Sequence, residues 1–222
     1  MADCVARKLV IFGTGNYARI LYRMATGAGF EVLAFTSDTE APEKGVIDGA
    51  PFIPSNKIVD FCRDTDAGIA LGFIGKDQQF SREDKFRCLK REGIRFPNVI
   101  QPGASVDSDD IGHGNVLFAG ARIGFQCSIG DCNIFWQNAS VAHDNKVGSF
   151  NHFGPNSSMA GYAEVSDHCF IGIGSSLNND AVMEQGSLLG ANAFLKGRLH
   201  AGKVCVPALS GELETVQASL FF

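Results

Sequence analysis

A histidine followed directly by a carboxylate, His143-Asp144, is the side-chain pair in this sequence best suited to acid–base chemistry. A neutral imidazole titrates near neutral pH, so it can take a proton from an attacking amine or hydroxyl group. A carboxylate that contacts the ring can orient it and raise its basicity. Because neighbouring residues do not necessarily face each other, contact between the two is an expectation that only a structure can test.

A second group of residues suited to binding lies near the start of the chain. The apolar stretch 8–12 predicts a strand, and the loop Gly13-Thr14-Gly15-Asn16 follows it before a helical pattern begins. A glycine-rich loop in this context presents backbone N–H groups to a phosphate or a ribose. Ala18 replaces the third glycine of the dinucleotide fingerprint, so the loop is only a weak indication of NAD. Asp38 and Gly72 each follow a later predicted strand and are further candidates for nucleotide contact.

The elements that position the glycine-rich loop alternate along the first half of the chain. Strands are predicted at 8–12, 31–35, 68–72 and 95–100, and helices at 19–26, 54–62 and 81–91. Such alternation indicates a parallel sheet with helices on its faces. We therefore expect residues 1–102 to form a Rossmann-like α/β domain.

A period of six residues replaces this pattern from about residue 103. Fifteen positions spaced six apart are all apolar: Ile111, Leu117, Ile123, Ile129, Phe135, Val141, Val147, Phe153, Met159, Val165, Ile171, Leu177, Met183, Leu189 and Leu195. The residue two before each is compact, and the residue after each is often glycine. A β-sandwich would instead place its turns at irregular intervals of about 8–12 residues.

The strict period predicts a parallel β-helix of triangular coils over residues 103–222. Three hexads make one coil, so Ile111, Ile129 and Val147 should stack in one column. We expect the aliphatic residue to point inward and the glycine that follows it to permit the turn. The fifteen hexads correspond to about five coils. His143 then lies where a coil turns, with its side chain free to point outward.

Composition argues against several classes of protein. With 19 Lys and Arg against 24 Asp and Glu, the net charge is −5 and no basic run occurs, so nucleic acid is not an expected partner. No stretch approaches the roughly 20 apolar residues of a membrane span, and no secretory segment is visible, so no membrane association is expected. Seven cysteines without a Cys-x-x-Cys pair predict reduced thiols in the cytoplasm.

Three stretches carry a resemblance to a known family: Gly13 to Asn16, residues 141–152, and Ala160-Gly161 with residues 169–174. Together with the hexads, they resemble the bacterial sugar acyltransferases that include sialic acid O-acetyltransferases and nucleotide-linked amino-sugar N-acetyltransferases. The resemblance implies a left-handed β-helix and a homotrimer. It also implies that acyl-CoA lies in the cleft between adjacent β-helices and that the N-terminal domain holds a nucleotide-linked sugar.

The same resemblance implies roles for individual residues. His143 would be the general base, Asp144 would orient it, and the Gly161 backbone N–H would support the thioester oxyanion. His152 would contact the acyl donor, while Ile173 and Ala191 would line the pantetheine channel. The nucleotide-sugar would contact the N-terminal set, Gly13, Thr14, Gly15, Asn16, Asp38 and Gly72.

Three departures from the family pattern bear on the substrate. Trp136 stands where relatives often carry asparagine, and its indole would reshape the sugar pocket or stack on a ring. Cys205-Val206-Pro207-Ala208-Leu209 replaces the usual Gly-x-Pro-Ala-Lys, which leaves contacts to the adenine end of CoA open. The loop 73–80 is longer than usual near the expected sugar position.

The sequence thus predicts an acetyl-CoA-dependent N-acetyltransferase, without a metal, acting on a UDP-, GDP- or dTDP-linked deoxy-amino sugar in bacterial surface glycan biosynthesis. O-acetylation of a sialic-acid-like sugar is the alternative within this class. Two further alternatives belong to other classes: a non-catalytic nucleotide-sugar-binding scaffold and a zinc enzyme. A zinc site would need three converging histidines, and the spacing of His143, His152 and His168 does not match that of zinc-binding β-helices.

Overall fold

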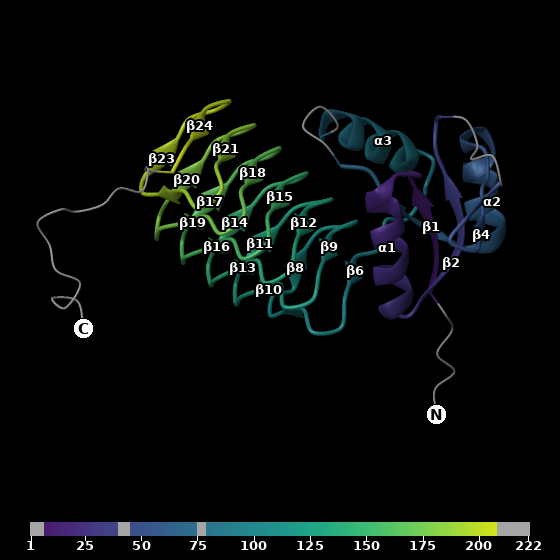
Figure 1. The fold of residues 1–222 in the computed structure, drawn as a ribbon, viewed down its shortest axis with the longest axis horizontal. Coiled ribbons are helices and arrows are strands. Elements are labelled where there is room, and N and C mark those ends of the chain that lie inside the picture. The colour runs from purple at the N-terminus through teal and green to yellow at the C-terminus, as the bar shows by residue number, and fades with distance from the viewer. Residues whose placement is uncertain (1–6, 40–44, 75–78, 208–222) are drawn as a thin grey trace, which may run out of the picture.

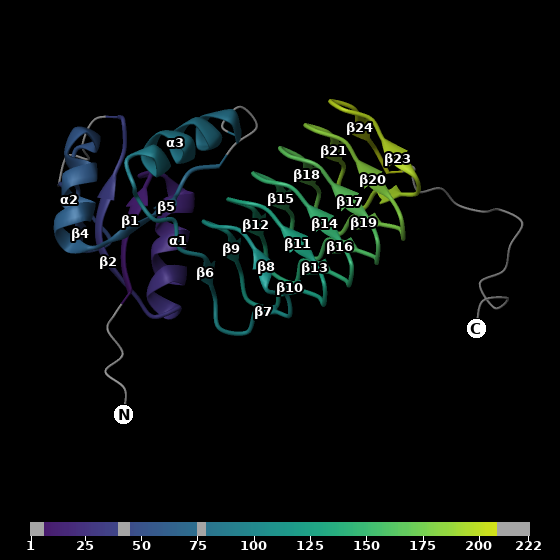
Figure 2. The same ribbon diagram turned by 180° about the vertical axis from the view of Figure 1, so that it is seen from behind.

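The computed structural model describes residues 7–39, 45–74 and 79–207. A small α/β region is followed by a parallel β-helix whose coils run away from it, so that β1 and β24 lie toward opposite ends of the molecule (Figure 1). Figure 2 shows the same arrangement from behind. Within the described residues, no helix is long and apolar enough to cross a membrane.

A three-stranded parallel sheet forms the centre of the α/β region. Its strands are β1 (Arg7–Phe12), β2 (Phe30–Thr36) and β5 (Gly68–Leu71), in the order β2-β1-β5. The short strands β3 (Val46–Ile47) and β4 (Ala50–Pro51) pair with each other in antiparallel fashion. All three strands of the parallel sheet were predicted from the sequence.

Helices cover both faces of this sheet. Side chains alternate across each strand, so successive residues of β1 pack on opposite faces. Leu9 and Ile11 pack with helix α1 (Asn16–Gly27) in one hydrophobic cluster. Val10 and Phe12 pack on the other face with the helices η1 (Ser55–Lys57), α2 (Ile58–Thr65) and α3 (Gln79–Arg91) nearby. Both clusters also include buried residues of the β-helix, so the two halves of the chain share their cores.

The predicted fourth strand of this sheet, at 95–100, is wrong. The Ile69 N–H donates to the Arg95 carbonyl at 2.8 Å, but the pairing with β5 goes no further. Pro97 has no N–H to continue a ladder. The only strand in the segment is β6 (Val99–Ile100), which pairs with β9 (Val116–Leu117) in the β-helix.

The β-helix consists of two-residue strands separated by corners. After β6 and β9 in the sheet they share, the strands are β7 (Ser105–Val106), β8 (Asp110–Ile111), β10 (Arg122–Ile123), β11 (Ser128–Ile129), β12 (Ile134–Phe135), β13 (Ser140–Val141), β14 (Lys146–Val147), β15 (His152–Phe153), β16 (Ser158–Met159), β17 (Glu164–Val165), β18 (Phe170–Ile171), β19 (Ser176–Leu177), β20 (Val182–Met183), β21 (Leu188–Leu189), β22 (Phe194–Leu195), β23 (Arg198–Leu199) and β24 (Val204–Cys205). Each of the fifteen apolar positions predicted from the period is the second residue of one of these strands.

Three parallel sheets make the sides of the prism. We call them side A, β7-β10-β13-β16-β19-β22; side B, β8-β11-β14-β17-β20-β23; and side C, β6-β9-β12-β15-β18-β21-β24. Ile129 pairs with Ile111 and Val147, which confirms the predicted column. With six or seven strands on a side, the structure has about six coils, one more than the fifteen hexads alone supply.

The residues that make the turns of the β-helix are not the glycines that were predicted to do so. Left-handed backbone occurs three residues after the inward residue, mostly without glycine, as at Gln126 (φ 54°) and Asp144 (φ 56°). Glycines such as Gly130 follow the inward residue directly, and no positive φ occurs there. A Cβ on Gly130 would lie 2.7 Å from the Gly148 carbonyl in the next coil. These glycines therefore permit close stacking of coils, and the expectation that they permit the turn is wrong.

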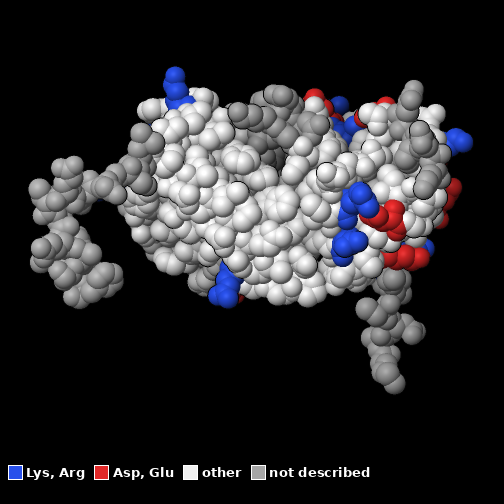
Figure 3. All heavy atoms as spheres, in the orientation of Figure 1, with Lys and Arg blue, Asp and Glu red and all other residues white. Residues whose placement is uncertain are grey.

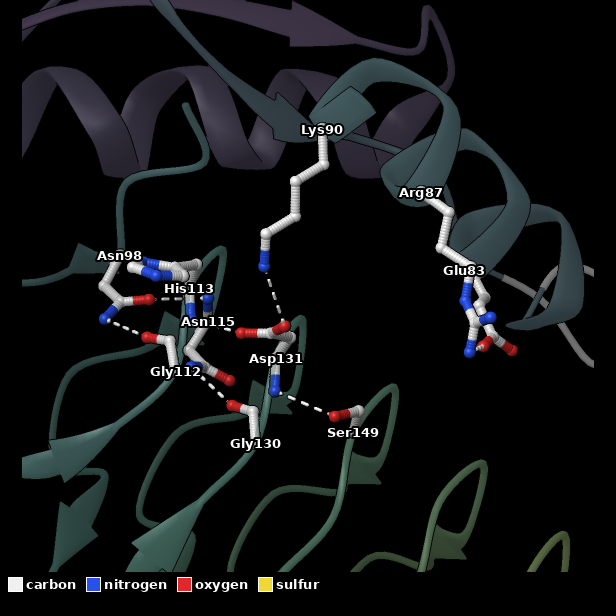
Figure 4. Close-up of polar contacts among 10 residues, drawn as sticks. All are labelled: Glu83, Arg87, Lys90, Asn98, Gly112, His113, Asn115, Gly130, Asp131 and Ser149. Carbon is white, nitrogen blue, oxygen red and sulfur yellow. Dashed lines mark hydrogen bonds and ion pairs between the residues drawn. The ribbon is translucent and has the colours of Figure 1, made fainter. Parts of the chain in front are cut away.

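A ladder of buried asparagines explains part of the compact column. The N–H groups of Asn133 and Asn151 each donate at 2.9 Å to the side-chain oxygen of the asparagine eighteen residues earlier. The Asn115 amide also donates to the Gly130 carbonyl, and Asn98 to the Gly112 carbonyl (Figure 4). These bonds satisfy corner carbonyls that would otherwise be buried unpaired.

Helix α3 fastens the α/β region to the β-helix. Arg82, only 3% exposed, donates to the carbonyls of Leu71 and Phe73 and to that of Cys132 at a corner of the β-helix. Further along the helix, Lys90 reaches Asp131 at 3.4 Å (Figure 4). The helix therefore fixes the end of β5 relative to the coils.

Replacement of Gly130 by alanine tests the role assigned to these glycines. We expect Gly130→Ala to lower the free energy of unfolding by about 2 kcal/mol, because the added methyl group must push two coils apart. Urea unfolding measures the change. The matched control is Gly27→Ala at the end of α1, where nothing lies within 4 Å of the added Cβ. Equal stability of the two variants would contradict the assignment.

Candidate functional site

His143 lies at the corner of the β-helix between side A and side B, after β13 and before β14. Its side chain points outward and is 52% exposed. Asp144 adopts the left-handed conformation of this corner, and its Oδ2 lies 2.7 Å from His143 Nδ1. The corner conformation therefore brings two adjacent residues into contact.

This contact determines which ring nitrogen carries the proton. A carboxylate only accepts hydrogen bonds, so the bond to Asp144 places the proton of the neutral ring on Nδ1. Nε2 is then left with its lone pair. Such an arrangement would suit a general base, because the neighbouring carboxylate holds the ring in one tautomer.

Gly161 occupies the same corner one coil later, directly beside the His143 ring. A Cβ at Gly161 would lie 2.7 Å from His143 Cε1 and 3.0 Å from Nε2, so any larger residue would displace the imidazole. The rings of Tyr162 and His143 are nearly perpendicular, with their centroids 5.4 Å apart. Among the hydrogen bonds of the described residues, the Gly161 N–H has no acceptor, so it is available to an oxyanion beside the imidazole.

A cavity of about 730 Å³ opens at the carboxyl ends of β1, β2 and β5. Ligands of parallel α/β sheets bind at this edge, where the strand order reverses. All seven residues predicted to bind the nucleotide-sugar line this cavity: Gly13, Thr14, Gly15, Asn16, Asp38, Gly72 and Trp136.

Close packing of the sheet accounts for two of these glycines. Gly13 has a φ of +139°, and a Cβ there would lie 2.5 Å from the Gly72 carbonyl oxygen. A Cβ on Gly72 would lie 2.6 Å from a methyl carbon of Ile11 and 3.0 Å from the Cβ of Ala18. The absence of a side chain at Gly72 is thus required by the protein itself, in addition to any approach of a ligand.

Lys85 and Tyr17 are cavity residues that sequence reasoning missed. Lys85 on α3 pairs with Asp38 at 2.7 Å and lies over the ring of Phe12. Tyr17 is the first buried residue of α1 and packs against Trp136. The sequence predicted both helices, but nothing in it indicated that Lys85 would reach a residue 47 positions earlier.

The predicted residues divide between two corners of the β-helix. Trp136, Ile173 and Ala191 lie at the corner between side C and side A. His143 and Gly161 lie at the corner between side A and side B. Within one chain, the structure does not bring these two sets together.

His152 lies on the outer surface of side C, in β15. Its ring stacks on Phe170 at 4.6 Å and tilts against Trp136 at 5.9 Å. Burial, and secondarily the positive charge of Arg82, lower the pKa of His152 to about 4. The ring is therefore neutral at physiological pH and suited to hydrogen bonding.

The three histidines considered for zinc lie on different parts of the prism. His143 is at one corner, His152 is on side C, and His168 is buried at the corner between side B and side C, where Nε2 lies 2.8 Å from Glu83 Oε2. In the described part of the chain, no three His, Cys, Asp or Glu side chains lie together in a way that could hold a metal ion.

A second cavity, of about 670 Å³, lies at the opposite edge of the sheet. Its lining includes Arg7, Lys8, Phe30 and Arg95, and none of the predicted site residues. It opens at the amino ends of the strands, away from the glycine-rich loop. We therefore take the cavity at the carboxyl ends as the candidate binding site.

Solved structures with the same fold cover nearly the whole chain. The acetyltransferase domain of PglB from Neisseria gonorrhoeae, in complex with acetyl coenzyme A, is 23% identical with a TM-score of 0.79, covering 91% of this chain and 98% of that one. A histidine-to-alanine mutant of GDP-perosamine N-acetyltransferase from Caulobacter crescentus, in complex with CoA and GDP-perosamine, is 25% identical with a TM-score of 0.78, covering 92% and 97%.

WeeI from Acinetobacter baumannii is 18% identical with a TM-score of 0.74, covering 89% of this chain and 95% of that one. No protein-family model and no curated protein sequence matches the chain. The solved structures establish the fold, an α/β region followed by a parallel β-helix. They agree with the resemblance to sugar acyltransferases noted in the sequence.

Two features noted in the sequence lie partly outside the described residues. These are the loop 73–80, of which residues 75–78 are not described, and the C-terminal stretch from residue 208.

The environment of His152 predicts acid destabilisation. The unfolded chain binds a proton at this residue below about pH 6.5, while the folded protein stays neutral there down to about pH 4. The stabilisation is present above pH 6.5 and is lost as the pH falls, by roughly 3 kcal/mol between pH 7.5 and 4. Urea unfolding between pH 4 and 7.5 should show that His152→Phe removes this dependence, while replacement of the exposed His200 by glutamine keeps it. An unchanged pH dependence in His152→Phe would contradict the prediction.

Proposed function

We propose that this protein is an acetyl-CoA-dependent N-acetyltransferase that modifies the amino group of a nucleotide-linked deoxy-amino sugar. The observation that carries the proposal is the corner formed by His143, Asp144 and Gly161, which combines an oriented base with an available N–H donor. The PglB domain and GDP-perosamine N-acetyltransferase, whose folds match over about nine tenths of this chain, support acyl transfer as the reaction.

In the proposed reaction His143 Nε2 takes a proton from the sugar amine as the amine nitrogen forms a bond to the thioester carbonyl carbon. The Gly161 N–H donates a hydrogen bond to the developing oxyanion. When the carbon–sulfur bond breaks, His143 returns the proton to the departing thiolate. Asp144 stabilises the imidazolium that forms between these steps.

The separation of the two corners supports a site completed by a second copy of the chain. Both corners border side A, where the outward residues of the three middle strands β13, β16 and β19, Ser140, Ser158 and Ser176, are small and uncharged, while Arg122 and Phe194 point outward from β10 and β22. If the copies of a trimer pack side A around a three-fold axis, the His143 corner of one copy meets the Ile173 and Ala191 corner of the next. His143, Gly161, Ile173 and Ala191 then line one groove for acyl-CoA.

The surface composition is consistent with this packing. Apolar side chains that are exposed in the single chain include Phe125 and Tyr162 at the His143 corner, and Ile173 and Phe194 at or next to the other. Few charged side chains lie over the face of the β-helix in Figure 3, whereas many gather over the α/β region. Exposed apolar patches of this kind mark interaction surfaces.

The finer features of the proposal follow the family resemblance. They are a left-handed β-helix, a Rossmann-like nucleotide-binding role for the α/β region, and a cytoplasmic location, where acetyl-CoA is available and thiols stay reduced. The reversal of strand order at β1 and the lining of the 730 Å³ cavity support nucleotide binding.

Substitution at His143 tests the reaction. With acetyl-CoA and either GDP-perosamine or a UDP-linked 4-amino sugar, we expect His143→Ala to lower kcat by about 10²–10⁴-fold. Asp144→Asn should cause a smaller loss, on the order of tenfold or more, because it weakens the orientation of the base. Release of CoA thiol measures the rate.

Replacement of the exposed His200 by alanine serves as the control and should leave the rate unchanged. Full activity of His143→Ala would exclude this base. Transfer to sialic acid in place of both amino sugars would favour O-acetylation, and no transfer to any acceptor would favour a binding scaffold.

Complementation between two inactive variants tests the shared site. Ala191→Trp should block the acyl-CoA groove at one corner, and His143→Ala removes the base at the other. Each mixed trimer should contain one working groove of three, because one junction receives an intact corner from each copy, so a randomly assembled population should regain about a quarter of wild-type activity. The baseline is a mixture of the two separately purified variants whose subunits have not exchanged. No recovery in verified mixed trimers would contradict the shared site.

A further inference from the structure

Two buried polar atoms beside the cavity have no hydrogen-bond partner among the described residues. They are Tyr17 Oη and Trp136 Nε1, on rings whose centroids lie 5.9 Å apart. Both residues line the 730 Å³ cavity. Native proteins rarely leave buried polar groups unpaired, so such a pair at a cavity wall calls for a functional explanation.

Packing holds the two rings in place. Phe118 stacks on one face of the Trp136 indole at 4.4 Å and 8°, so this face cannot stack on a sugar. Tyr17 is 6% exposed and belongs to the hydrophobic cluster between α1 and the β-helix. Because the rings are fixed, their polar atoms are pre-organised for one geometry of ligand.

The positive charge of Arg82 determines which kind of ligand atom the two polar groups can bind. Arg82 is buried, donates only to carbonyl groups, and has no carboxylate within ion-pair distance among the described residues. Burial raises the pKa of Tyr17, and the positive charge of Arg82 opposes this shift, as expected for a guanidinium nearby. The indole N–H can only donate a hydrogen bond. An electron-rich oxygen fits these surroundings, and an ammonium group does not.

We propose that Tyr17 and Trp136 form a donor pair that binds an oxygen acceptor, a hydroxyl or carboxylate group, on the sugar of the nucleotide-linked substrate. The inference rests on the proposed function and refines it. With the rings held in place, the side chains that cover the two atoms move aside when the sugar enters and open them to the cavity. The sugar is thereby oriented with its oxygen toward α1 and its amine away from Arg82, toward the His143 corner of the adjacent copy.

Binding measurements test the pair without relying on acetyl transfer. The probes are UDP-glucose, GDP-mannose and dTDP-glucose, each compared with UDP, GDP or dTDP alone by titration calorimetry. The dissociation constant of the bare nucleotide divided by that of its nucleotide-sugar isolates the contribution of the sugar. We expect Tyr17→Phe and Trp136→Phe each to reduce this ratio about tenfold for the nucleotide-sugar that binds the wild type most tightly, with affinity for the bare nucleotide unchanged.

Tyr22→Phe is the matched control, because Tyr22 lies on the same helix, packs on Phe35 and does not line the cavity. An unchanged ratio in both cavity variants would overturn the proposal. So would an equal loss for bare nucleotide and nucleotide-sugar, or a wild type that binds none of the probes. If the ratio falls as expected while no acetyl-CoA-dependent transfer occurs, the proposed function fails and the donor pair stands.

Stability of the ligand-free protein provides the second measurement. Since Tyr17 Oη has no partner to lose, Tyr17→Phe should leave the melting temperature unchanged or raise it, within about 2 °C of Tyr22→Phe. A larger fall than in Tyr22→Phe would show that the hydroxyl group is already bonded within the protein, which contradicts the proposal.

Discussion

Direct stacking of one coil on the next is the constraint on which the rest of the structure depends. Each backbone corner lies against the corner eighteen residues later, so close in places that a Cβ on Gly130 would meet the Gly148 carbonyl at 2.7 Å. A residue's neighbours are therefore set by its position in the coil. The asparagine ladder uses the same register, because each side chain bonds to the coil above. A shift by a single residue would expose the column of inward aliphatic side chains.

The register also builds the candidate catalytic corner. His143 and Gly161 are eighteen residues apart, so the imidazole of one coil lies over the glycine of the next. The left-handed turn that most corners share brings Asp144 back onto the His143 ring. Geometry that serves folding at other corners here holds an imidazole, a carboxylate and an N–H without an acceptor among the described residues in one place. Little additional structure is needed to make such a corner reactive.

The sequence predicted whatever depends on period, and missed whatever depends on contact between distant segments. The fifteen inward positions and the three strands of the α/β sheet follow from local patterns. The glycines after the inward residues were assigned to turns because their contact partners lie a full coil away. Pro97 ended a strand that apolar residues had suggested. Lys85 reaches Asp38, and Arg82 reaches Cys132, through the docking of α3, for which no periodic signal exists.

Arg82 shows how the two halves of the chain act as one unit. Its guanidinium bonds to carbonyl groups at the end of β5, on the cavity, and at Cys132, on a coil. The same buried charge reaches Tyr17 in the α/β region and His152 on side C, as their pKa shifts indicate. A buried cation bonded only to neutral groups lowers the stability of the fold, because its desolvation is not offset by an opposite charge. Its position between the cavity and the coils suits the proposed function, in which a nucleotide-linked sugar is held relative to an acyl donor on the β-helix.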